Sequence, residues 1–236
     1  MKKSIIYLIA TFFFNSFFGQ LQYGVKAGLN YNLISVNVKQ GSSTDVDNPS
    51  GLGFHIGGYA SYSLNESLSV RPELLFSSCG TKEKSETSES TPSIDDNNNL
   101  ITITTTTESE DKSKFNYLEI PVLADYAVSE NFSVQAGPSV GLLIGFKDES
   151  SYTTTTKYSN GDPSETMNFS GTSSSKVGLN SLNLGLALGG IYHLDNGLHL
   201  GLRYQRGLNS INSLYTDFIT EKWNIIQLSV GYTLSK

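Results

Sequence analysis

Apolar and polar side chains alternate along eight stretches of this chain, and the connections between these stretches are alternately short and long. Residues 182–194 show the pattern clearly, because leucines occupy positions 182, 184, 186 and 188 and small or polar residues lie between them. Side chains two residues apart lie on the same face of a strand. Each stretch therefore predicts a β-strand with one apolar face, as in a soluble sandwich or a membrane barrel.

The connections distinguish these two folds. The predicted strands cover residues 23–35, 53–64, 68–78, 115–128, 132–146, 182–194, 198–205 and 224–234. Residues 65–67, 129–131 and 195–197 are tight connections of hairpin type, whereas the other connections are long and polar. Short periplasmic turns and long extracellular loops are typical of bacterial outer-membrane barrels. We expect an all-β fold, an eight-stranded antiparallel up-and-down transmembrane β-barrel whose first and last strands pair and leave no open edge.

The first residues are typical of a secretion signal. Lys2 and Lys3 precede an apolar run over residues 5–14, which is too short to span a bilayer comfortably. We expect a signal peptide over residues 1–19 and one barrel domain over residues 20–236, and an uncleaved N-terminal anchor is the alternative. The single cysteine, Cys79, excludes an internal disulfide.

Successive side chains of a strand alternate between its two faces, and this alternation, or parity, predicts which side chains face lipid. The outward positions are apolar and uncharged, which a barrel requires because a cation at the bilayer midplane costs roughly 2–4 kcal/mol. Four tyrosines of this parity fall at the periplasmic ends of alternate strands: Tyr62, Tyr126, Tyr192 and Tyr232. Because tyrosine is enriched at membrane interfaces, these four residues predict an aromatic girdle.

The opposite parity places charges in the lumen. The inward charged residues are Lys26, Arg71, Glu73, Glu119, Asp125 and Arg203, which sum to zero. Side chains fill the interior of an eight-stranded barrel, and buried charges must pair because their desolvation is costly. We expect a structural plug of salt bridges, in which Arg71 and Glu119 on adjacent strands could pair directly. A path for ions or protons is the alternative.

The long connections carry the excess negative charge. Removing Lys2 and Lys3 changes the formal net charge from −6 to −8, and −5 of this lies in residues 81–112. Residues 101–107 and 152–158 are β-branched runs that predict hairpins continuing above the membrane. Residues 81–99 are acidic and serine-rich, and we expect them to be mobile. The acidic surface disfavours nucleic-acid binding.

Several segments resemble one known family. These segments are GVKAGLNYN near the start of the barrel domain, SVRPELLFSSCG, NYLEIPVLADY, and LGLRYQRGL near the end. They resemble the PorT-like outer-membrane β-barrel family of Bacteroidetes over nearly the whole mature chain. The resemblance implies an outer-membrane barrel, and the best-known member of the family is linked to protein secretion and gliding.

Catalytic patterns are weak. Residues 173–176 match the S-x-x-K pattern of acylating serine enzymes, but they lie in a serine-rich loop instead of at a helix start. His193 and His199 flank a tight turn and should pair across two strands, but two imidazoles without a third ligand make a poor zinc site. We therefore expect no catalytic residue, no metal and no cofactor.

Three functions remain. The chain could be a structural or interaction protein that acts through its extracellular loops, a narrow channel for small solutes, or a barrel enzyme. The acidic loops favour the first function, the filled lumen counts against the second, and the missing catalytic constellation counts against the third. The expected partners are outer-membrane lipid and other envelope or secretion proteins, and we expect the barrel to be monomeric.

Overall fold

The computed structural model describes residues 21–38, 48–95, 97–214 and 218–235. Its strands are β1 (Leu21–Val38), β2 (Ser50–Ser63), β3 (Leu68–Ile94), β4 (Leu100–Ala127), β5 (Phe132–Tyr158), β6 (Glu165–Ser173), β7 (Leu182–His193), β8 (Leu198–Gly207) and β9 (Ile219–Ser235). The expected signal peptide over residues 1–19 lies outside the described residues. Within the described ranges, no helix is long and apolar enough to cross a membrane.

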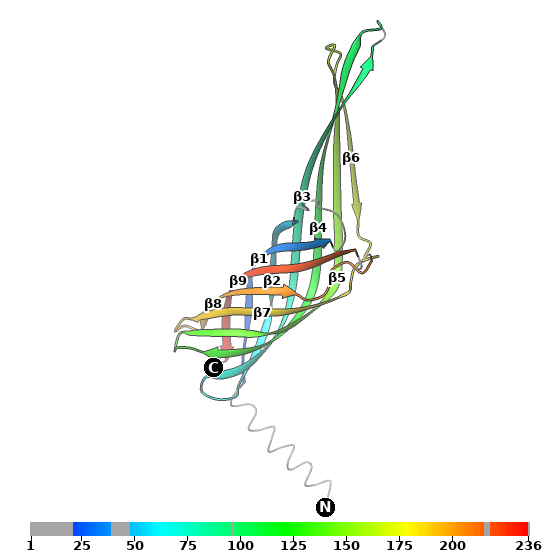
Figure 1. Ribbon diagram of the computed structural model, residues 1–236. Helices are drawn as coiled ribbons and strands as arrows, with labels where there is room; N and C mark the ends of the chain where they lie inside the picture. The colour runs from blue at the N-terminus through cyan, green and yellow to red at the C-terminus, as the bar shows by residue number, and fades with distance from the viewer. Residues whose placement is uncertain (1–20, 39–47, 96, 215–217, 236) are drawn as a thin grey trace, which may run out of the picture.

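Eight of these strands close into a ring (Figure 1). The order around the ring is β1, β2, β3, β4, β5, β7, β8 and β9, and each strand is antiparallel to its neighbours. The first and last strands then pair from Gly24↔Thr233 to Val38↔Ile219, which leaves the ring without an open edge. The predicted eight-stranded antiparallel up-and-down barrel is confirmed.

The three predicted tight turns are also confirmed. In the β2–β3 turn, the side-chain oxygen of Asn65 accepts hydrogen bonds from the backbone N–H groups of Ser67 and Leu68, at 2.9 and 2.8 Å. In the β7–β8 turn, Gly197 has a φ of 86°, a conformation that glycine adopts without steric cost. We call the end of the barrel that carries these turns the turn end.

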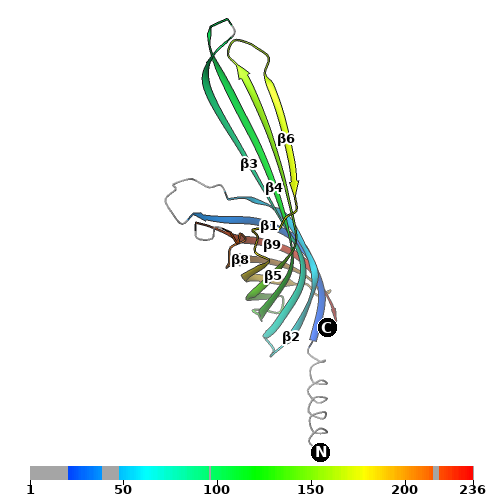
Figure 2. The ribbon, with the colours of Figure 1, turned by 90° about the vertical axis from the view of Figure 1, so that its right-hand side faces the viewer.

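Beyond the other end of the barrel, β3, β4 and β5 continue and are joined by β6 (Figures 1 and 2). These three strands have 27, 28 and 27 residues, more than twice the roughly 9–11 residues needed to cross a bilayer. We call this four-stranded extension, residues 83–111 and 149–173, the arm. It confirms the hairpins expected above the membrane.

The expectation that residues 81–99 are mobile is wrong for most of that segment, because residues 81–94 belong to β3. They pair with β4 without a register shift up to Ile94↔Leu100. Hydroxyl groups pair across the two strands, as in Ser88 with Thr106 at 2.8 Å. Low hydrophobicity predicted disorder, but the β-branched run in β4 supplies a partner strand.

The two faces of the barrel follow the predicted parity. Outward residues such as Leu29, Ile56, Leu74, Leu188 and Leu228 are between 54 and 63 % exposed. The inward positions next to them are buried, polar ones included. The barrel therefore has an apolar outer surface and a filled interior.

Candidate functional site

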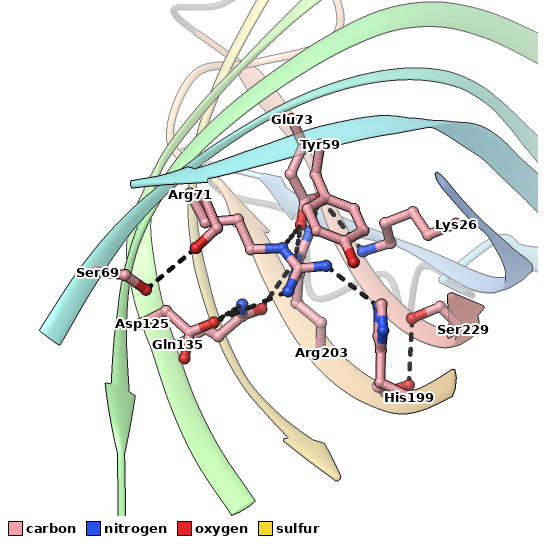
Figure 3. A network of polar contacts seen from close by, with 12 residues as sticks. Lys26, Tyr59, Ser69, Arg71, Glu73, Asp125, Gln135, His199, Arg203 and Ser229 are labelled. Carbon is pink, nitrogen blue, oxygen red and sulfur yellow. Dashed lines mark hydrogen bonds and ion pairs between the residues drawn. The ribbon is translucent and has the colours of Figure 1, made fainter. Parts of the chain in front are cut away.

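The polar network in the lumen is centred on the carboxylate of Glu73 in β3, whose side chain is fully buried (Figure 3). Arg203 in β8 donates to both carboxylate oxygens, Nη1 to Oε2 and Nη2 to Oε1, each at 2.8 Å. Lys26 Nζ in β1 lies 3.2 Å from Oε2, and Arg71 Nε lies 3.4 Å from Oε1. Three cations from three strands thus meet one carboxylate.

Asp125 in β4 joins this network through a glutamine. The amide nitrogen of Gln135 donates to Asp125 Oδ2 at 2.8 Å, and Arg203 Nη2 donates to the amide oxygen of Gln135 at 3.1 Å. Arg71 Nη1 lies 3.9 Å from Asp125 Oδ2. The network therefore connects β1, β3, β4, β5 and β8 across the lumen.

Arg71 also contacts aromatic side chains. Its guanidinium carbon lies 3.5 Å from the ring centroid of Tyr59, a cation–π arrangement, and its Nη2 is 3.2 Å from His199 Nε2. The Tyr59 hydroxyl shares a hydrogen bond with Thr233 Oγ1 at 2.8 Å. Analysis of the sequence by formal charge missed Tyr59, Gln135 and His199 as members of this network, although their inward parity could have pointed to them.

Glu119 lies apart from these residues. It is buried, forms no ion pair with the described residues, and its Oε2 accepts no hydrogen bond from them. In the β3–β4 register, Arg71 lies opposite Leu123, so Asp125 is two residues away from that position and Glu119 is four. The suggested direct pairing of Arg71 with Glu119 is therefore wrong.

A small cavity lies beside Glu119. Tyr117, Gln205 and Trp223 are among its lining residues, and its volume of about 10 Å³ is room for about one water molecule.

A cluster of apolar residues, which we call the apolar cap, lies at the end of the barrel toward the arm. It comprises Ile34, Cys79, Phe115, Tyr117, Leu143, Ile211, Trp223 and Ile225, all buried. The Trp223 ring packs edge-on against Phe115 with centroids 5.2 Å apart, and its Nε1 donates to the Tyr117 hydroxyl at 3.1 Å. The sequence analysis expected a plug of charges alone and did not predict this layer.

At the turn end the lumen opens into a vestibule of about 450 Å³. Arg71, Asp125 and His193 lie in its wall, beside residues of the tight turns. His193 is opposite His199, as expected, with ring centroids 5.9 Å apart. Within the described ranges, no three His, Cys, Asp or Glu residues are grouped so that they could hold a metal ion.

The four tyrosines of the expected girdle all lie near the turn end. Tyr62 pairs with Leu21, Tyr126 with Leu68, Tyr192 with Phe132 and Tyr232 with Leu198, so each lies opposite the first residue of a strand. Toward the arm, Tyr31 and Tyr204 flank Ile226 at one height and are 43 and 41 % exposed. These two outward tyrosines were not singled out from the sequence.

Comparisons with known proteins place this geometry in a family. No curated protein matches the sequence. Similar solved structures include Ail, the attachment invasion locus protein of Yersinia pestis (13% identity, TM-score 0.39, 91% of this chain and 99% of that chain). Another is Neisserial surface protein A (15% identity, TM-score 0.37, 89% of this chain and 96% of that chain). A third is OprG from Pseudomonas aeruginosa (11% identity, TM-score 0.34, 91% of this chain and 96% of that chain). The model of the outer membrane protein beta-barrel domain matches residues 14–213, and the chain belongs to this family of outer-membrane β-barrels.

Proposed function

We propose that this protein is a barrel with a plugged lumen that binds partners outside the cell through its arm. The observation that carries the proposal is the arm itself, a sheet built from strands that run unbroken out of the barrel. Strands continuous with a closed ring hold the sheet in a fixed position above the membrane. A structural or interaction role uses such a platform, whereas transport through the lumen does not need it.

The arm offers open strand edges to a partner. Along residues 165–173, β6 pairs only with β5, and every one of these residues is exposed. On the other side of the arm, residues 83–94 of β3 pair only with β4. Unpaired backbone N–H and C=O groups at a sheet edge can accept an additional strand. We infer that β6 is the preferred edge, because Met167 and Phe169 are 59 and 71 % exposed there.

The orientation follows from the asymmetry of the connections. The arm lies at one end of the barrel, and the tight turns lie at the other (Figure 2). Bacterial barrels place their short turns in the periplasm, so we propose that the arm is extracellular. Residues 1–19 serve as the export signal in this proposal.

The lumen supports a closed barrel. The charged network lies below the apolar cap, so a solute would have to displace two different layers of buried side chains. We propose that Lys26, Arg71, Glu73, Asp125 and Arg203, together with Glu119, are structural, and that Tyr62, Tyr126, Tyr192 and Tyr232 form an interfacial girdle. A narrow channel for small solutes is the second candidate, favoured only by the vestibule at the turn end.

The resemblance to the PorT-like family of Bacteroidetes suggests what the partners are. We propose other envelope proteins, with a link to secretion or gliding, as binding partners of a monomeric barrel. This proposal rests on the segments that resemble the family, including residues 69–80 and 116–126.

Site-specific photo-crosslinking on intact cells tests the interaction role. A crosslinking amino acid at Phe169, on the β6 edge, should give a discrete adduct with another envelope protein. The same amino acid at Glu130, in a tight turn at the opposite end, is the control. In a further variant, arm residues 84–109 and 151–170 are replaced by short turns. This variant should keep the heat-modifiable gel migration of a folded barrel, and it should form no adduct, because the β6 edge is absent. Failure to obtain any adduct at Phe169 would count against the proposal.

A further inference from the structure

Lysines gather on the outer surface where the barrel meets the arm. In the register of β3, β4 and β5, Lys82 lies opposite Lys112, and in the adjacent row Lys114 lies opposite Lys147. The side chains of Lys82, Lys112 and Lys147 are 45, 53 and 55 % exposed. Two rows of facing lysines therefore lie on the surface that continues the lipid-facing side of the barrel.

Glutamates neutralise only part of this charge. Glu110 contacts Lys82 and Lys84 at 3.1 Å each and Lys112 at 2.6 Å, and Glu149 contacts Lys147 at 2.5 Å. Lys114 forms no ion pair with any residue that the structure describes. Like charges directly opposite each other on a sheet are destabilising. Of the facing pair Lys114 and Lys147, Lys147 thus has a carboxylate partner, and Lys114 has none among the described residues.

A groove of about 510 Å³ runs beside these lysines. Its lining includes four lysines, Lys82, Lys112, Lys114 and Lys147, one acid, Glu149, and the apolar residues Leu52 and Phe54. Gly80 lies opposite Lys114 and lines the groove without a side chain. Leu52 is 73 % exposed and Phe54 is 43 % exposed. The groove thus joins a cationic part to an exposed apolar part.

The groove lies at the upper boundary of the apolar band. Below it, Ile56, Phe76, Leu118 and Leu142 form one outward row across β2, β3, β4 and β5. Lipid chains cover such a row, so the lysines just above it lie at the depth of the lipid headgroups. At the other end of the barrel, the tight turns 64–67, 129–131 and 195–197 contain no Lys or Arg. The tight turns therefore offer an anionic headgroup no cation of their own.

We propose that this groove binds a phosphorylated lipid of the outer leaflet, with the phosphate on Lys82, Lys114 and Lys147 and an acyl chain along Leu52 and Phe54. A lipid phosphate supplies the anion that Lys114 lacks, and its chain runs along the exposed apolar residues. An acidic protein segment would satisfy Lys114, but it would not follow Leu52 and Phe54 into the apolar band as an acyl chain does. The inference rests on the proposed function, because the groove faces the outer leaflet only if the arm is extracellular.

Lipid retention in nanodiscs tests the site independently of orientation in the cell. The full-length mature protein is reconstituted in phosphatidylcholine with added lipid A, or with lipid A from which the phosphates have been removed. Binding is measured by native mass spectrometry and by titration with fluorescent lipid A. The wild type should retain the phosphorylated form preferentially, and inorganic phosphate should compete poorly because it lacks the acyl chain.

Substitutions assign the effect to the groove. Lys114→Gln should weaken binding of lipid A about fivefold, and combined Lys82→Gln, Lys114→Gln and Lys147→Gln about a hundredfold, if each lysine near the surface contributes the usual amount. Lys114→Arg should retain binding. Lys157→Gln is the matched control, because Lys157 is also exposed and also lies outside every ion pair of the described residues, but it is in the arm.

Two results would overturn the site. One is equal retention of phosphorylated and dephosphorylated lipid A by the wild type. The other is an equal loss of binding in Lys114→Gln and Lys157→Gln, which would indicate a general effect of charge. Heat-modifiable migration of each variant shows that it is folded, so that a loss of binding is not a loss of the barrel. Failure here leaves crosslinking through Phe169 unaffected, so the two proposals are tested separately.

Discussion

Arg203 binds both carboxylate oxygens of Glu73 at 2.8 Å, although 130 residues separate them in the chain. The two residues lie in β8 and β3, which are not neighbours in the ring. Their contact therefore spans the lumen, and it adds to the backbone pairing that holds the barrel together. Because the Glu73 side chain is fully buried and contacts three cations, each of them depends on this one acid.

Arg203→Met should destabilise the barrel by roughly 3–5 kcal/mol, because it breaks a buried ion pair and removes the donor that binds both carboxylate oxygens of Glu73. Combining it with Glu73→Gln should destabilise the barrel further, because Lys26 and Arg71 then lose the carboxylate that both contact. Urea unfolding in lipid vesicles, followed by the fluorescence of Trp223, measures the change. Arg206→Met is the matched control, since Arg206 lies on the same strand but is exposed. Equal destabilisation by both substitutions would contradict a structural role for the network.

Arg71 should be coupled to Asp125 and not to Glu119. The ion-pair distance from Arg71 Nη1 to Asp125 Oδ2 is 3.9 Å, whereas Glu119 forms no ion pair with the described residues. A double-mutant cycle of Arg71→Met with Asp125→Asn should give a coupling energy of about 0.5–3 kcal/mol, and the cycle with Glu119→Gln about zero. The unfolding midpoints of the wild type, the two single variants and the double variant in each cycle provide the measurement. A larger coupling to Glu119 would show that Arg71 adopts a different conformation in the membrane.

The strands could be predicted from the sequence because parity in a barrel is a local property. One residue in two must face lipid, so the leucines of residues 182–188 reveal both the strand and its outward face. The same reasoning correctly placed Lys26, Arg71, Glu73 and Arg203 inside the barrel. The closing pair of β1 and β9 followed from the even number of strands.

Contacts across the lumen could not be predicted, because they depend on the stagger between strands. Arg71 and Glu119 lie on adjacent strands, but the register sets Arg71 opposite Leu123 and brings Asp125 nearer. The apolar cap was missed for a related reason. Trp223 and Phe115 are far apart in sequence, and only the ring brings their side chains to a centroid distance of 5.2 Å.

Glu110 provides a test of electrostatics at the base of the arm. Hydrogen bonds from Lys112, and also from Lys82 and Lys84, lower the pKa of this half-buried carboxyl from its ordinary value of 4.5 to about 2. Because the pKa is lowered, these contacts stabilise the folded arm at pH values above 4.5. This stabilisation is lost as the pH falls through about 2. Carboxyl ¹³C NMR should therefore show Glu110 titrating at about pH 2, below its ordinary value of 4.5.

Lys112→Gln should raise the titration midpoint of Glu110 toward 4.5, because Lys112 is the largest cause of the lowered pKa. The control variant Lys157→Gln, farther along the arm, should leave the midpoint unchanged. An ordinary midpoint in the wild type would mean that the lysines do not contact Glu110 in solution. The facing Lys82 and Lys112 of β3 and β4 would then lose the acid that contacts both of them.

Planar-bilayer recordings test the plugged lumen. The wild type should show little or no conductance, because the charged network and the apolar cap both fill the bore. Trp223→Ala should leave conductance low, since the network around Glu73 lies below the cap and remains intact. A large and steady wild-type conductance, altered by Arg203→Met without a change in stability, would support the channel instead.

The orientation of the barrel can be tested with epitope insertions at the two ends. An epitope at Gly161 should be tolerated, because this glycine has a φ of 89° in an exposed turn with no atom within 4 Å of the position a Cβ would take. Antibody should label it on intact cells. An epitope at Asn131, in the β4–β5 turn, should be labelled only after permeabilisation. Labelling in the reverse pattern would place the arm in the periplasm, and the lysine groove would then face the inner leaflet, where binding of lipid A in nanodiscs would have no counterpart in the cell.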